Sequence, residues 1–217
     1  CENDITLNEN LFLIGYSNGG YNSIAMHEEL SKRPRDFDID ASVVIAGYFD
    51  LKREEDFKYP EIIETPAWAI YHSYVLNKTY NLNVIDKIIR SPYVERLDDL
   101  FNGEYSATYI DQKLTRYTEQ LFTADFLNNY DTLPIFDNYK EAIASNSLMN
   151  ANISGDIFLI HSKEDEVVPY EQSQNLYDSV KSKGVNAELM LLEKGNHSPQ
   201  DYVMSVVEAL KWLEQYD

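Results

Sequence analysis

A serine in a glycine-flanked turn, directly after a short apolar segment, constrains the fold most. Leu11–Ile14 is wholly apolar and ends at a glycine, which is typical of a parallel strand buried on both faces. The turn Gly15-Tyr16-Ser17-Asn18-Gly19 follows, and residues 22–30 then have helical character. A strand, a tight turn and a helix in this order place the serine hydroxyl above the sheet, at the positive end of the helix. We expect the first and last glycines of the turn to relieve crowding between strand and helix.

Further strand-like and helical segments alternate on either side of a long middle region. The expected strands are 41–46, 156–160 and 187–192, and the expected later helix is 171–183, stopped by Gly184. The last helix is expected to bury an apolar face formed by Val203, Val206, Val207, Leu210 and Leu213. Strands that alternate with helices predict an α/β fold with a parallel sheet.

The middle region, residues 52–153, has a different texture. It is rich in Tyr, Asn and Asp, contains no strand-like run of Val and Ile, and shows repeated helix starts and stops such as Thr65-Pro66 and Gly103. We expect a core formed by residues 1–51 and 154–217, interrupted by a helical cap or lid over residues 52–153.

Charge and cysteine content exclude several classes of protein. The chain has 18 basic and 37 acidic side chains and a net charge of −19, which argues against a nucleic-acid partner and against charge-driven membrane binding. No apolar run approaches the roughly 20 residues of a transmembrane helix. The single cysteine, Cys1, excludes an internal disulfide; we expect a truncated or processed chain there rather than a lipid anchor. No phosphate-binding loop or metal-ligand spacing occurs, so no cofactor and no metal are expected.

Ser17 needs a base to act as a nucleophile, and the chain has four histidines. His197 lies in the loop between the last strand and the last helix, at the edge of the sheet where Ser17 is expected, and is the candidate base. His27 is expected on the exposed side of the first helix. His72 lies inside the insertion, and His161 ends the third strand, where it either lines the site or braces the next loop.

The acid that orients the base is expected in the loop after the third strand. Glu164, Asp165 and Glu166 are adjacent there, and charge alone does not separate them. Asp165 is preferred because packing of Val167-Val168-Pro169 would aim its side chain inward. Asp50, after the second strand, is the alternative. The backbone amide of Asn18 is the candidate donor to an oxyanion.

The order Ser17, Asp165, His197 resembles that of the α/β-hydrolase fold. The segment His161–Pro169 is similar to the His-Gly-x-x-Asp-x-x-Val-Pro stretch of its esterase and prolyl-oligopeptidase-like members, with Ser162 in place of glycine. The long insertion and the Asn146–Leu148 segment resemble bacterial secretory-lipase-like hydrolases.

The resemblance implies a serine hydrolase that cleaves a small-molecule ester or acyl compound, in a secreted or cell-envelope location. Two alternatives stay open: a prolyl-oligopeptidase-like serine peptidase, and a non-catalytic hydrolase-like binding module. Members of the fold carry several strands before the serine, and few residues precede it here. We therefore expect an amino-terminal fragment or a second chain to complete the sheet and the oxyanion hole.

Overall fold

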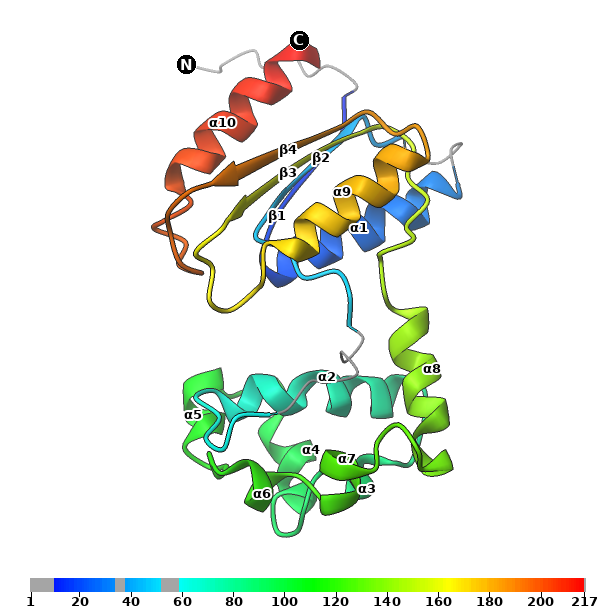
Figure 1. Ribbon diagram of the computed structural model, residues 1–217, viewed down its shortest axis with the longest axis vertical. Helices are drawn as coiled ribbons and strands as arrows, with labels where there is room; N and C mark the ends of the chain where they lie inside the picture. The colour runs from blue at the N-terminus through cyan, green and yellow to red at the C-terminus, as the bar shows by residue number, and fades with distance from the viewer. Residues whose placement is uncertain (1–9, 34–37, 52–58, 217) are drawn as a thin grey trace, which may run out of the picture. The chain divides into compact units, whose positions relative to one another are not determined.

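The computed structural model describes residues 10–33, 38–51 and 59–216, and Cys1 lies outside them. The chain divides into two compact units (Figure 1). Residues 1–51 and 147–217 form a sheet unit, and residues 52–146 form a helical unit.

A four-stranded parallel sheet forms the centre of the sheet unit. Its strands are β1 (Phe12–Tyr16), β2 (Ala41–Ile45), β3 (Asp156–Ser162) and β4 (Ala187–Leu192). They pair in sequence order. In the register, Ile14 of β1 lies beside Val43 of β2, and Val44 of β2 lies beside Leu159 of β3. The prediction of a parallel sheet is confirmed. Because all four strands run the same way, the loops that follow them open at one edge of the sheet.

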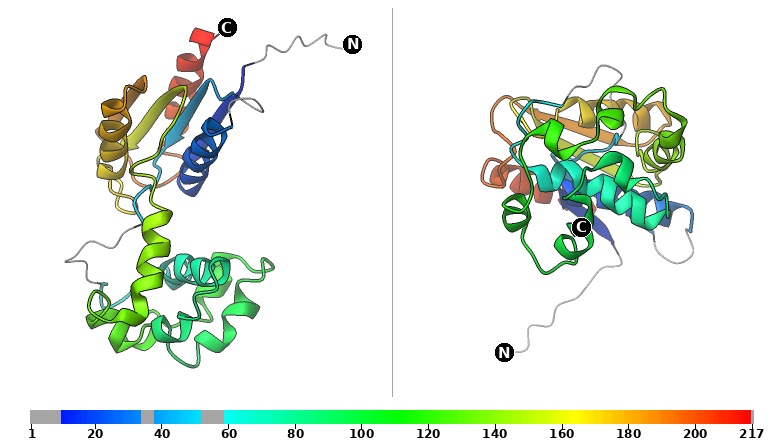
Figure 2. Two further views of the ribbon diagram at one scale, coloured as in Figure 1. Left: turned by 90° about the vertical axis from the view of Figure 1, so that its right-hand side faces the viewer. Right: turned by 90° about the horizontal axis from the view of Figure 1, so that it is seen from below.

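Helices cover both faces of this sheet (Figure 2). Helix α1 (Asn18–Ser31) and helix α9 (Glu171–Ser182) pack on one face, where Ile24, Leu159 and Leu176 meet. Helix α10 (Val203–Leu213) packs on the other and continues into the 3₁₀ turn η3 (Glu214–Tyr216). Apolar strands with both faces covered explain the continuous Val and Ile runs in the sequence.

Of the apolar face expected for α10, Leu213 packs on the sheet as predicted, whereas the other four residues, Val207 included, are exposed. Val203, Val206 and Leu210 are exposed, whereas Ala209 and Leu213 are buried. The apolar stripe of α10 is therefore wider than the surface that the sheet offers to it.

His27 is buried rather than exposed, contrary to the expectation from its position after an apolar run. Its Nδ1 accepts a hydrogen bond from the Ser42 hydroxyl at 2.7 Å, and its Nε2–H donates to the Ser154 carbonyl. The ring thus links α1 to β2 and to the segment before β3. Burial holds the pKa of His27 below its ordinary value.

The segment before β3 belongs to the sheet unit, so the division falls a few residues earlier than expected. Leu148, Ala151 and Ile153 join the core under α1 and α9. The Leu148 amide also donates to the Phe49 carbonyl at 2.9 Å.

The helical unit consists of short helices between tight turns. Its elements are α2 (Pro66–Thr79), α3 (Ile85–Ile88), η1 (Val94–Arg96), α4 (Leu97–Leu100), α5 (Ala107–Asp111), α6 (Thr118–Leu121), α7 (Ala124–Asn128), η2 (Pro134–Phe136) and α8 (Asp137–Ser145). Aromatic rings fill its interior: Phe126 contacts Phe122, Tyr130 and Phe136. Within the described ranges, no helix has the length and apolar character needed to cross a bilayer.

We predict that the free energy of unfolding falls as the pH drops below about 6.5, the ordinary histidine pKa. The folded state holds His27 neutral, so the unfolded chain binds the proton more readily, and stability present above that pH is lost on acidification. Denaturant unfolding between pH 7.5 and 5.5 measures the slope, to which one histidine adds at most about 1.4 kcal/mol per pH unit. The His27→Gln protein should show a shallower slope; an unchanged slope would contradict the prediction.

Candidate active site

Three side chains from separate loops meet at the carboxyl-terminal edge of the sheet. Ser17 follows β1, Asp165 follows β3 and His197 follows β4. The Ser17 Oγ lies 2.7 Å from the His197 Nε2, and the His197 Nδ1 lies 2.7 Å from the Asp165 Oδ2. The carboxylate can only accept, so Nδ1 carries the proton and Nε2 is free to accept the serine proton. The arrangement can therefore remove a proton from Ser17.

Ser17 has a strained backbone. Its φ is 54° and its ψ is −122°, a positive-φ conformation that residues other than glycine rarely adopt. The Ser17 amide donates to the Ile45 carbonyl at 2.9 Å, and the Ser17 carbonyl accepts from the Gly20 amide at 2.9 Å. These bonds to β2 and to α1 hold the turn in place and leave the hydroxyl directed at His197.

The glycines around Ser17 do not all serve the purpose expected from the sequence. A Cβ on Gly15 would lie 2.2 Å from the Gly19 carbonyl oxygen, and one on Gly20 would lie 2.6 Å from a Val44 methyl group. A Cβ on Gly19 would meet nothing within 4 Å. The expectation was right for Gly15 and wrong for Gly19; Gly20 is the residue that allows α1 to approach β2.

Asp165 is a buried carboxylate with hydrogen bonds to both oxygens. Its Oδ1 accepts from the amides of Val167 at 3.0 Å and Val168 at 2.9 Å, and its Oδ2 accepts from His197. Burial alone would raise the pKa of Asp165, but the hydrogen bonds from Val168, His197 and Val167 outweigh it and hold that pKa below its usual range. The carboxylate is thus ionised beside the imidazole.

The neighbours of Asp165 explain why it faces inward. Glu164 and Glu166 are exposed, whereas Asp165 is 8% exposed. Val168 is buried as expected, but Val167 is 67% exposed and does not help to pack the loop. The loop is therefore held by the Asp165 side chain and Val168.

Asn196 connects the loops that carry His197 and Asp165, and the sequence contained no signal for this. Its side-chain Oδ1 accepts from the His197 amide at 2.7 Å and from the Glu166 amide at 3.1 Å. The Asn196 amide donates to Asp201 at 3.0 Å. One asparagine therefore sets the spacing of the two loops.

The other sequence candidates lie elsewhere. His161 is fully buried and braces the loop after β3: its Nδ1 pairs with the Ser173 Oγ at 2.8 Å and its Nε2 with the Val168 carbonyl at 2.9 Å. Burial lowers its pKa. Asp50 accepts from the Ser147 hydroxyl at 3.0 Å, and His72 lies in α2 of the helical unit.

Asn18 is the first residue of α1. The first N–H groups of a helix have no partner inside that helix, and they lie at its positive end. Asn18 is the residue after Ser17, so its backbone amide lies next to the position at which an oxyanion formed at Ser17 would need a donor.

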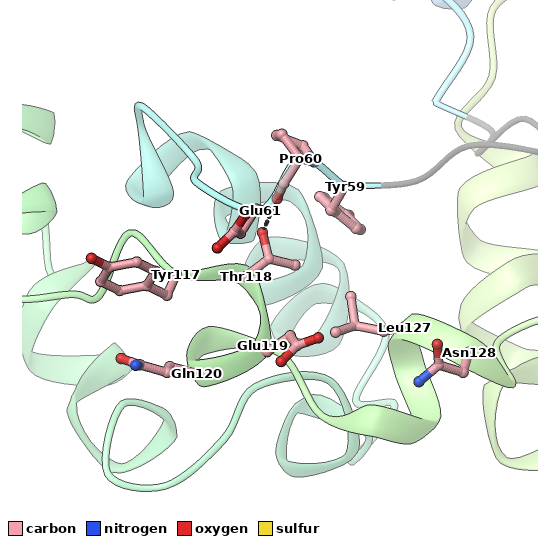
Figure 3. A pocket seen from close by; sticks show the side chains of 9 residues that line it. All are labelled: Tyr59, Pro60, Glu61, Tyr117, Thr118, Glu119, Gln120, Leu127 and Asn128. Carbon is pink, nitrogen blue, oxygen red and sulfur yellow. Dashed lines mark hydrogen bonds between the residues drawn. The ribbon is translucent and has the colours of Figure 1, made fainter.

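The helical unit has a cavity of its own, of about 640 Å³ (Figure 3). Tyr59, Pro60, Glu61, Tyr117, Thr118, Glu119, Gln120, Leu127 and Asn128 line it. None of the residues at the sheet edge contributes to it. Among the described residues, no group of three His, Cys, Asp or Glu side chains is arranged to hold a metal ion.

The sequence of residues 95–216, more than half of the chain, matches the prolyl oligopeptidase family. This match includes Asp165 and His197 and ends short of Ser17 on the amino-terminal side. A comparison with curated proteins gives no match.

Solved structures with the α/β-hydrolase fold resemble most of the chain. The rice cell wall degrading esterase LipA of Xanthomonas oryzae matches with a TM-score of 0.71 and 22% identity, over 88% of this chain and 53% of that one. Candida antarctica lipase A in its closed state matches with a TM-score of 0.71 and 14% identity, over 96% and 49%. A Legionella pneumophila protein described as a hydrolase matches with a TM-score of 0.70 and 19% identity, over 97% and 57%. These likenesses confirm the predicted fold, and the chain spans about half the length of each protein.

The strain at Ser17 predicts a difference between two substitutions. Ser17→Ala and Ser17→Gly both remove the hydroxyl, but only glycine, which has no Cβ, adopts a φ of 54° without steric strain. We expect the Gly variant to be more stable than the Ala variant by about 1 kcal/mol. Denaturant unfolding of the two proteins measures it, and equal stabilities would show that the turn is unstrained.

Proposed function

The chain belongs to the prolyl oligopeptidase family, and we propose that it cleaves carboxylic esters as a serine hydrolase with Ser17, His197 and Asp165 as its catalytic triad. The observation that carries the proposal is the unbroken hydrogen-bonded series from the Ser17 hydroxyl through His197 to the buried Asp165 carboxylate. A strained turn presents the serine, and a buried, ionised acid orients the base.

Each group has a definite task in this mechanism. The Ser17 Oγ attacks the ester carbonyl while His197 Nε2 takes its proton, and Asp165 stabilises the imidazolium that forms. The Asn18 amide donates to the oxyanion of the tetrahedral intermediate. His197 then returns the proton to the leaving alcohol, which leaves an acyl group on Ser17. A water molecule, deprotonated by His197, releases the acid in the second half of the cycle.

The choice of an ester over a peptide bond rests on the neighbouring folds. Two of the similar structures are described as an esterase and a lipase, whereas the matching family is named after prolyl oligopeptidase, a peptidase. A prolyl-oligopeptidase-like peptidase is therefore the second candidate. A non-catalytic binding module is the third, and it would not require a reactive serine. We assign the helical unit the role of a cap that selects the acyl or alcohol part of a small-molecule substrate.

The edge of the sheet bears on the partners of the chain. β1 pairs with β2 on one side only within the described residues, and Leu11 and Ile14 are exposed there. An unpaired apolar edge strand favours association. We propose that a strand from an amino-terminal segment or a second chain pairs with β1.

A fluorophosphonate probe tests for a reactive serine. The protein at its full natural length should be labelled and should hydrolyse short p-nitrophenyl esters, and Ser17→Ala should abolish both while the protein stays folded. Ser182→Ala, on the exposed end of α9, is the matched control and should react as the parent does. Labelling of the Ser17→Ala protein would remove Ser17 from its role, and preference for prolyl peptides over esters would favour the peptidase.

A second comparison tests the acid. Asp165→Asn should lower kcat/KM by orders of magnitude, because the amide cannot stabilise the imidazolium or hold the proton on Nδ1. Glu164→Gln, one residue away and exposed, should have little effect. An inactive Asp50→Asn protein beside an active Asp165→Asn protein would transfer the assignment to the loop after β2.

A further inference from the structure

Tyr202, the residue directly before α10, contacts the acid of the site from inside the protein. It is 2% exposed. Its hydroxyl donates to the Asp165 Oδ2 at 3.1 Å and accepts from the Ser162 amide at 3.1 Å. The phenol therefore both donates and accepts: it donates to Asp165 and accepts from Ser162, the last residue of β3.

We propose that Tyr202 is a positioning residue that holds the Asp165 carboxylate against His197 and, by sharing Oδ2 with the imidazole, limits the negative charge that the imidazole feels. The catalytic consequence rests on the proposed function; the hydrogen bonding does not. Nothing in the chain order marks Tyr202 for this role, because it is one of 17 tyrosines and precedes a helix.

The aromatic packing fixes the phenol in place. The Tyr202 ring lies against the Tyr16 ring at 5.7 Å between centroids, and the Tyr16 ring stacks on the His197 ring at 5.3 Å and 26°. Tyr16, in contrast, finds no hydrogen-bond partner for its buried hydroxyl among the described residues. The two tyrosines thus have different tasks: Tyr16 supplies a flat surface to His197, and Tyr202 supplies a donor to Asp165.

The charges around Asp165 leave the phenol as a neutral donor. Burial raises the pKa of Tyr202, and the negative charge of Asp165 raises it further. These two effects outweigh the hydrogen bond from the Ser162 amide, which lowers it, so the Tyr202 hydroxyl keeps its proton at neutral pH. His161 Nε2 lies 3.5 Å from the Asp165 Oδ2, but it donates to Val168, and burial keeps it neutral.

Two further carboxylates lie on these loops: Asp201 on the loop that carries His197, and Glu166 on the loop that carries Asp165. Asp201 accepts from the Asn196 backbone amide, and Glu166 accepts from the Asn196 side chain at 3.2 Å. Both carboxylates are occupied by Asn196. Tyr202 is therefore the neutral donor whose removal changes the charge on the Asp165 Oδ2 without removing a charge from the site.

Tyr202→Phe is the test, because it keeps the ring and removes only the hydroxyl. With one donor fewer, Oδ2 presents more negative charge to His197 and stabilises the imidazolium. The acid limb of the kcat/KM profile should move up by about half a pH unit, a threefold change in the protonation equilibrium. We also expect kcat to fall about tenfold with KM unchanged, because the carboxylate is held less firmly.

Tyr216→Phe is the matched control. The Tyr216 hydroxyl donates to Asp156 at 2.6 Å at the opposite end of β3, so the substitution deletes the same kind of phenol–carboxylate bond away from His197. It should lose stability comparably and leave the pH profile where it was. A purely structural role for Tyr202 would make the two variants behave alike.

An NMR titration of the His197 ring in the resting protein separates this inference from the proposed function. The ring's titration midpoint should rise in Tyr202→Phe and stay in Tyr216→Phe, whether or not the protein hydrolyses esters. Fluorotyrosine at position 202, a stronger hydrogen-bond donor, should move the midpoint down. This variant provides the test if the Tyr202→Phe protein fails to fold. Midpoints that do not respond to either change would overturn the proposal, and a folded protein that no fluorophosphonate labels would overturn only the proposed function.

Discussion

The parallel pairing of four strands is the constraint on which the site depends. Ser17, Asp165 and His197 are far apart in the chain, and they meet because β1, β3 and β4 all end at the same edge of one sheet. The segment between β2 and β3 includes the whole helical unit. This segment can be long because its two ends join strands that are neighbours in the sheet. A shift of one residue in the β1 register would turn the Ser17 hydroxyl away from His197.

Burial sets the charge states around that edge. His27 and His161 are held neutral by burial, which outweighs their hydrogen bonds to backbone carbonyls; those bonds would favour the charged form. Asp165 is ionised in the same surroundings because four donors, from two backbone amides, His197 and Tyr202, face its two oxygens. Desolvation thus favours the neutral form in the histidines, and hydrogen bonding overcomes it in the carboxylate.

The apolar surface left uncovered on the sheet unit follows from the same architecture. Leu11, directly before β1, and Ile14 on β1 are exposed, and so are Val206 and Leu210 on α10. Phe12 and Tyr16 on β1 contact Tyr216 and Tyr202, which flank α10, so these two β1 side chains lie on the face of the sheet that α10 covers. Surfaces of this kind mark interaction sites, which agrees with the proposed partner strand at β1.

The sequence by itself determined the elements of the sheet and the candidate site: four apolar strands, the glycine-flanked Ser17, and His197 and Asp165 in loops after later strands. These follow from local patterns, because strand burial, turn chemistry and chain order are written in neighbouring residues. Only the tertiary structure decided that His27 is buried, that α10 packs through Ala209 rather than its valines, and that Gly20 rather than Gly19 is the close approach. It also decided that Asn196 and Tyr202 support the site. Each of these depends on what another segment places opposite the residue, and no local pattern carries that information.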